Sequence, residues 1–145
     1  RPTSASVAGN TGYPYSFEDF RGRFNRALGA NRGQFIGAPE RVKSTVQMKN
    51  VDGFVIIMKF HGSGKPRVIM CGGTPLNDSE RGVNNLYLRS AIQASNSKLT
   101  ADSANAALQQ LMKKGLTYVG IFDCGAIRYT LSTYDGTMML TAMER

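Results

Sequence analysis

Residues 116–143 read LTYVGIFDCGAIRYTLSTYDGTMMLTAM, and this stretch decides the class of fold. Two turn sequences, Asp123-Cys124-Gly125 and Tyr134-Asp135-Gly136, interrupt runs that are rich in β-branched, aromatic and other large apolar residues. Asp-Gly between such runs favours a tight hairpin. We therefore predict an antiparallel meander whose three strands cover residues 116–122, 126–133 and 137–143.

The first half of the chain predicts three further strands. Residues 42–49 broadly alternate apolar and polar side chains, which is typical of a strand with one wet face. Phe54–Met58 is continuously apolar, and such a run predicts a central strand that is covered on both faces. A loop at residues 61–65 then leads into residues 67–71. This pair of strands forms a hairpin with a basic tip.

Helical spacing appears in three segments. The first begins at Ser16, a good N-cap, and ends at Gly29, a natural stop. Its apolar residues recur on one face and form a stripe of Phe17, Phe20, Phe24 and Leu28. After a predicted surface loop at residues 72–83, a short helix is expected at 85–94, with Leu86, Leu88 and Ile92 buried. A longer helix is expected at 102–114, with Thr100 or Asp102 as its cap.

These elements predict a single α+β domain in 145 residues. About six strands in antiparallel β-meanders pack with two to three helices. Residues 1–15 are mostly small and polar, with Gly and Pro among them, and we predict a flexible N-terminal arm there. The domain then covers residues 16–145.

Charge is unevenly distributed along the chain. Lys and Arg number 18 against 10 Asp and Glu, which gives a net charge of +8. Residues 1–67 contain 11 basic and 4 acidic residues, whereas residues 68–145 contain 7 and 6. This asymmetry indicates a localised face that binds anions. The alternative is a solvated surface that is basic without binding anything.

The candidate site consists of basic residues near the first helix and in the loops that follow it. Arginine suits phosphate because its planar guanidinium donates two hydrogen bonds at once. No helix-turn-helix, zinc-finger or ribonucleoprotein motif is present, so we expect contacts to the phosphate backbone with little sequence preference. The predicted nucleic-acid-binding residues are Arg21, Arg23, Arg26, Arg32, Arg41, Lys43, Lys65 and Arg67.

Catalytic and metal-binding patterns are sparse. His61 with Cys71 or Cys124 makes a formal Cys-His pair, but both cysteines lie in apolar stretches where thiols are inert. We predict free thiols, with a single bridge between the two as the alternative. One histidine and two cysteines do not complete a zinc site by themselves. No catalytic residue, metal or cofactor is predicted, and no small-molecule substrate is identified.

The leading hypothesis is a non-enzymatic structural protein that binds nucleic acid, RNA rather than DNA, and self-assembles. A viral coat, nucleocapsid or matrix-type protein fits this description, as does a ribonucleoprotein subunit, in an intracellular or virion-associated setting. One alternative is a peripheral membrane or scaffold protein that uses the same basic face on anionic lipid. The other is an enzyme with an unrecognised site near His61.

Overall fold

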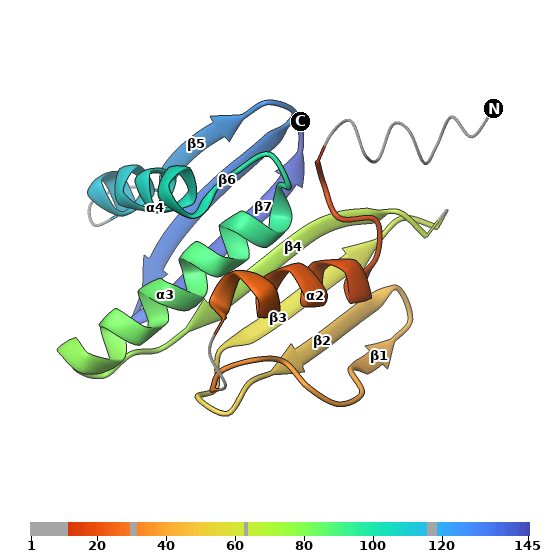
Figure 1. Cartoon of the computed structure of the whole chain (residues 1–145), viewed down its shortest axis with the longest axis horizontal. Helices are drawn as coiled ribbons and strands as arrows, with labels where there is room; N and C mark the ends of the chain where they lie inside the picture. The colour runs from red at the N-terminus through yellow and green to blue at the C-terminus, as the bar shows by residue number, and fades with distance from the viewer. Residues whose placement is uncertain (1–11, 30–31, 63, 116–118) are drawn as a thin grey trace.

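The computed structural model describes residues 12–29, 32–62, 64–115 and 119–145. These residues form one seven-stranded antiparallel sheet and three helices, and the helices lie on one side of the sheet (Figure 1). The predicted single-domain α+β class is therefore confirmed, with one strand more than the expected six. The helices are α2 (Phe17–Leu28), α3 (Asp78–Ser95) and α4 (Ala101–Gly115).

The sheet joins the two predicted meanders edge to edge. Its strands are β1 (Glu40–Val42), β2 (Thr45–Lys49), β3 (Val55–Phe60), β4 (Pro66–Gly73), β5 (Gly120–Cys124), β6 (Ile127–Tyr134) and β7 (Thr137–Glu144). In space they follow the order β1-β2-β3-β4-β7-β6-β5, and every neighbouring pair is antiparallel. The last strand of the chain, β7, thus lies beside β4, which is the central strand.

Helix α2 forms where the sequence predicts it. The Ser16 hydroxyl oxygen accepts a hydrogen bond from the backbone N–H of Asp19 at 3.1 Å. Gly29 ends the helix with φ at 67° and donates its N–H to the carbonyl of Asn25. The whole apolar stripe is buried against the core: Phe17, Phe20, Phe24 and Leu28. These caps and this stripe confirm the helix predicted between residues 16 and 29.

The predicted surface loop at residues 72–83 is limited to residues 74–77 in the structure. β4 continues through Gly73, and α3 begins at Asp78 with Asn77 as its N-cap. Gly72 pairs with Val55 on one side and Met139 on the other, and its position requires glycine because a Cβ there would lie 2.5 Å from the carbonyl oxygen of Met138. The longer helix also turns Leu86 outwards, so this residue is 38% exposed rather than buried.

Residues 42–49 are two strands, not one. A turn at Lys43 and Ser44 separates β1 from β2, and Lys43 adopts a φ of 55°. Three-residue β1 is therefore an additional edge strand that the alternating pattern did not reveal. Lys43 lies in the turn, while Lys49 is exposed on β2.

Only one face of the sheet is covered by helices, which corrects the prediction for residues 54–58. In β3, Ile56 and Met58 are buried beneath the helices, whereas Val55 and Ile57 point to the other side and are half-buried. In the described part of the chain, no helix or strand covers this second side, which we call the open face. At its centre are Val55, Ile57, Val68, Met70, Met139 and Met143.

The segment before α2 packs against the domain. Gly12, Tyr13 and Pro14 are buried, and the Tyr13 hydroxyl donates to the carbonyl of Ala142 at 3.3 Å. The Gly12 carbonyl accepts the N–H of Ser97 at 2.9 Å. Residues 1–11 of the predicted arm lie outside the described residues.

Candidate functional site

The arginines on α2 mostly bind to their own chain. One guanidinium nitrogen of Arg21 donates to the carbonyl of Gly37 at 2.5 Å, and the group lies 5.8 Å from the ring centre of Phe17. Arg23 pairs with Asp19 at 3.0 Å and donates to two backbone carbonyls. These contacts are structural. They leave the two side chains little freedom to meet a ligand.

Arg32 and Arg41 also have acidic partners. Arg41 pairs with Glu18 at 3.1 Å, and Arg32 pairs with Asp52 at 2.5 Å. Arg26 has no ion pair or side-chain hydrogen bond among the described residues, and it lines a shallow pocket between α2 and the end of α3. Four of the eight predicted site residues therefore have side chains without an ion pair or hydrogen bond to a described residue, namely Arg26, Lys43, Lys65 and Arg67.

Three of these four gather at one end of the sheet, together with a fourth cation. Lys59 on β3 lies opposite Thr45 on one side and Val68 on the other. Lys43 precedes Thr45 by two residues, and Arg67 directly precedes Val68. Lys65 lies in the β3–β4 turn, where its carbonyl accepts the N–H of His61 at 2.8 Å. We call Lys43, Lys59, Lys65 and Arg67 the basic end.

All four side chains of the basic end are exposed, and none forms an ion pair or side-chain hydrogen bond with a described residue. Sequence reasoning missed Lys59 because it directly follows an apolar run that predicts a strand. The predicted hairpin could have revealed it, because a turn that contains Lys65 brings Lys59 opposite Val68, next to Arg67. The basic end thus combines three predicted residues with one that was overlooked.

The nearest acid along the same row of the sheet is already neutralised. The row runs from Lys59 through Val68 and Met143 to Arg128 and Asp123. Arg128 binds both oxygens of the Asp123 carboxylate, at 2.8 and 3.0 Å. The hydrogen bonds from Arg128 hold the pKa of Asp123 below its usual value. Asp123 therefore does little to offset the positive charge of the basic end.

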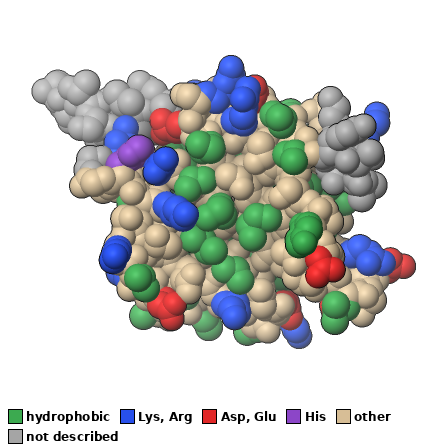
Figure 2. Space-filling view, turned by 180° about the vertical axis from the view of Figure 1, so that it is seen from behind, with side chains coloured by type: hydrophobic (Ala, Val, Ile, Leu, Met, Phe, Trp, Pro, Cys, Tyr) green, Lys and Arg blue, Asp and Glu red, His purple; other side chains and the backbone are tan. Residues whose placement is uncertain are grey.

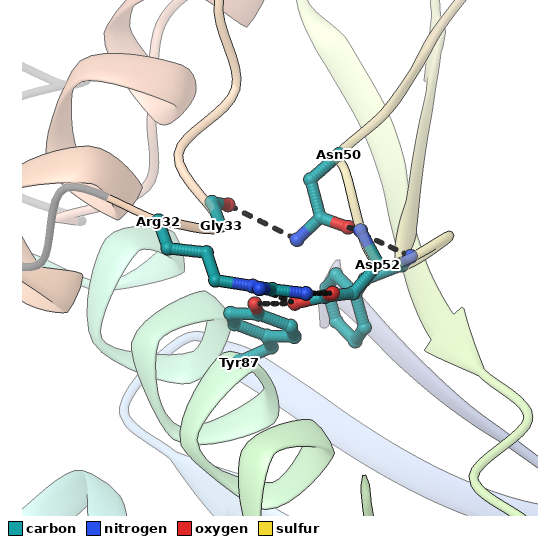
Figure 3. Close-up of polar contacts among 6 residues, drawn as sticks. Arg32, Gly33, Asn50, Asp52 and Tyr87 are labelled. Carbon is teal, nitrogen blue, oxygen red and sulfur yellow. Dashed lines mark hydrogen bonds and ion pairs between the residues drawn. The ribbon is translucent and has the colours of Figure 1, made fainter.

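A second group of polar side chains lies at the opposite end of β3 (Figure 3). Asp52, in the β2–β3 turn, accepts hydrogen bonds from Arg32 and from the hydroxyl of Tyr87 on α3. Asn50 supports this turn: its side-chain oxygen accepts the N–H of Asp52 at 3.0 Å, and its amide donates to the carbonyl of Gly33 at 3.0 Å. The network ties the turn and the segment after α2 to α3.

The hydrogen bonds of this network shift the pKa values of Asp52 and Tyr87. Hydrogen bonds from Arg32 and Tyr87 lower the pKa of Asp52, so the carboxylate is ionised near neutral pH. Burial, aided by the hydrogen bond to Asp52, raises the pKa of Tyr87 to about 12. Because Arg32 and Asp52 neutralise each other, the network presents no strong net charge to a ligand.

The same network borders a cleft of about 500 Å³. Leu28, Phe54, Val83 and Leu86 give it apolar walls, and Arg32, Asp52 and Glu80 add polar groups. A cleft of this size and character is in the range of small-molecule sites. Its charged groups are already bonded within the chain, since Glu80 accepts the backbone N–H of Leu76 at 2.9 Å.

Both cysteines are free thiols, as predicted. Cys71 is buried, and burial raises the pKa of its thiol, which favours the unreactive neutral form. The structure does not bring His61 and Cys71 together: Cys71 lies opposite Ile56, about 13 Å of strand from the His61 end of β3. In the segments that the structure describes, no three His, Cys, Asp or Glu side chains are grouped to hold a metal ion.

Comparisons with known proteins found no match to this chain among protein-family models, curated proteins or solved structures. Within the described segments, no helix has both the length and the apolar character needed to cross a membrane. The basic end, the cleft and the open face are the features of the described segments that bear on function.

Proposed function

We propose that this protein binds nucleic acid, with RNA as the expected partner, by holding phosphates at the basic end without catalysing a reaction. The observation that carries the proposal is the cluster of four exposed cations, whose side chains form no ion pair or hydrogen bond with a described residue. An unpaired Lys or Arg can bind a phosphate without first giving up an ion pair. Such contacts supply most of the affinity in sequence-independent binding.

The placement of the cations supports contact with a single phosphate chain. Neighbouring strands lie about 4.8 Å apart, so the register puts Lys59 within a few strand spacings of Lys43 and Arg67. Lys65 extends the same end through the β3–β4 turn. A strand spacing is shorter than the screening length of about 8 Å at physiological salt, so neighbouring cations at this end of the sheet reinforce one another's attraction for an anion chain.

The character of the contacts implies weak sequence discrimination. Phosphate contacts fix the position of a nucleic acid, whereas base contacts read its sequence. The only large aromatic side chain that is strongly exposed on β6 is Tyr134, and it lies at the end of the sheet away from Lys59. The basic end itself offers Lys and Arg side chains, which bind phosphate whatever the sequence.

Burial of the Phe stripe removes one of the two observations that favoured binding to a membrane. Such binding required the stripe of Phe17, Phe20 and Phe24 to be available for insertion, and all three side chains are buried. Attraction of the basic end to anionic lipid remains, at about 1 kcal/mol for each well-placed Lys or Arg. Anionic vesicles therefore belong in the test as a competing ligand.

The test is a binding measurement on the full chain by fluorescence anisotropy. The ligands are a short single-stranded RNA, a DNA duplex and phosphatidylserine vesicles, each across a salt series. We expect RNA to bind most tightly, with an affinity that falls steeply as salt rises. Absence of RNA and DNA binding at low salt, or tighter binding to the vesicles, would overturn the proposal.

A further inference from the structure

The centre of the open face is largely apolar. Across β3, β4 and β7, one row places Ile57 opposite Met70, and Met70 opposite Thr141. The rows on either side contribute the other four apolar side chains of the centre: Val55, Val68, Met139 and Met143. Lys59 is the only charged residue among these three rows of the three strands. Figure 2 shows hydrophobic side chains gathered over the middle of this face, with Lys and Arg mainly towards its margins.

Such a face is unusual for a sheet that meets water. Strands covered on one side alternate apolar and polar residues, whereas continuous apolar runs belong to sheets covered on both sides. Phe54–Met58 and Val68–Cys71 are runs of the second kind, yet the described helices cover one side only. The sequence of the central strands therefore fits a second cover that the described part of the chain does not provide.

The composition of residues 1–11 argues against this segment as the cover. Those residues read RPTSASVAGNT, in which Val7 is the only large aliphatic side chain. A single valine does not match the six apolar side chains at the centre of the open face. A second molecule that presents an apolar surface of similar extent would provide the cover.

We propose that the open face binds the open face of a second copy of this chain, so that two sheets form a sandwich. β4 is the fourth of seven strands, with three strands on each side. A twofold axis along β4 therefore sets β3 over β7 of the second copy, and β2 over its β6. Apolar centre meets apolar centre, as a self-complementary interface requires. Two sheets pack in this way about 10 Å apart.

The size and rim of the open face fit such an interface. Seven strands about 4.8 Å apart and about 20 Å long give roughly 700 Å², close to the roughly 800 Å² that each partner buries in a standard interface. The rim is polar, with Gln47 and Lys49 on one side and the Asp123–Arg128 ion pair on the other. An uncharged centre within a polar rim is typical of protein–protein interfaces.

This dimer rests on the apolar residues of the open face, whereas nucleic-acid binding rests on the exposed cations. Lys59 alone belongs to both, because it ends the row that it shares with Val68 and Met143. The two are nevertheless compatible in space. Rotation about an axis along β4 leaves both basic ends at the same end of the sandwich. The dimer then presents two sets of Lys43, Lys59, Lys65 and Arg67 to one phosphate chain.

The test is the mass of the nuclease-treated full chain by sedimentation equilibrium over a concentration series. We expect a species of twice the 15.8 kDa chain mass for the wild type. Met70→Lys and, separately, Thr141→Lys place a charge at the centre of the open face and should yield monomers. The matched control is Ile36→Lys, since Ile36 is 76% exposed and lies outside the open face. This variant should remain dimeric.

A monomeric wild type at every concentration would overturn the proposal, as would dimers of both face variants. Association that appears only with added nucleic acid or vesicles would also contradict it. Methionine oxidation of the wild type by peroxide provides a measurement that needs no variant. Met143 is 42% exposed in the single chain, so its oxidation should slow as concentration rises through the dimer transition. A rate that does not depend on concentration would contradict the sandwich.

Discussion

Arg23 and Asp19 form an ion pair across one turn of α2, with 3.0 Å between Nη2 and Oδ2. The same guanidinium donates to the carbonyl of Gly12 at 2.8 Å and to that of Ala94 at 3.4 Å. Arg23 thus joins the segment before α2 to the end of α3. The sequence predicts Arg23 as a nucleic-acid contact, but its guanidinium is already bonded to Asp19, Gly12 and Ala94. The side chains of the basic end have no such bonds to described residues.

Replacing Arg23 with alanine is expected to destabilise the fold rather than weaken ligand binding. The Arg23→Ala variant removes the ion pair and leaves the carbonyls of Gly12 and Ala94 without this donor. We expect a loss of about 1 to 3 kcal/mol in the free energy of unfolding, measured by urea denaturation. RNA affinity of the folded variant should stay close to that of the wild type. A large fall in affinity without a stability change would show that Arg23 meets the ligand.

Phe20 tests whether the apolar stripe of α2 is part of the core. Its side chain is fully buried, so Phe20→Ala should leave a cavity and cost about 3 to 5 kcal/mol of stability. Tyr134→Ala is the matched control, because Tyr134 is 84% exposed and its loss should change stability by about 0.5 kcal/mol or less. Equal urea midpoints for the two variants would contradict the described packing of α2.

The ionised carboxylate of Asp52 should make the stability of the fold depend on pH. Arg32 and Tyr87 lower its pKa from the ordinary value of 3.8, so the carboxylate stabilises the fold above that value. The contribution is lost as pH falls through the lowered pKa of the folded state. We expect the urea midpoint of the wild type to fall more steeply with acidification than that of Asp52→Asn. Parallel curves for the two proteins would contradict the stabilising role of the ionised carboxylate.

Local signals made much of the fold predictable. Ser16 and Gly29 bound α2 because capping depends on residues within one turn of the helix end. The hairpin turn at Asp135-Gly136 likewise formed where Asp-Gly predicted it, with positive φ at both residues. The boundaries of α2 and the β6–β7 turn therefore follow from short stretches of sequence.

The errors concern long-range packing. The sequence predicts Gly72 and Gly73 in a loop, yet both pair with β7 in the sheet. They are glycines because the backbone of β7 and the side chain of Asn84 leave no room for a Cβ, which the local sequence does not show. The candidate site was only partly predictable for the same reason. Sequence shows that Arg41 and Lys43 are both basic, but not that Glu18 pairs with the first and leaves the second exposed.

The central claim is that the unpaired cations of the basic end bind phosphate, and the salt dependence of RNA binding tests it most directly. The double variant Lys59→Ala, Lys65→Ala removes two exposed cations that no described side-chain interaction needs. Its control is Arg81→Ala, because Arg81 pairs with Asp78 at the start of α3. Affinity for single-stranded RNA is measured across a salt series for all three proteins.

We expect the slope of log affinity against log salt to become shallower by about 0.7 for each phosphate that is no longer neutralised, or about 1.4 for the double variant. The Arg81→Ala slope should match that of the wild type. A double-variant slope equal to the wild-type slope, with the fold intact, would contradict the assignment of the basic end as the nucleic-acid site.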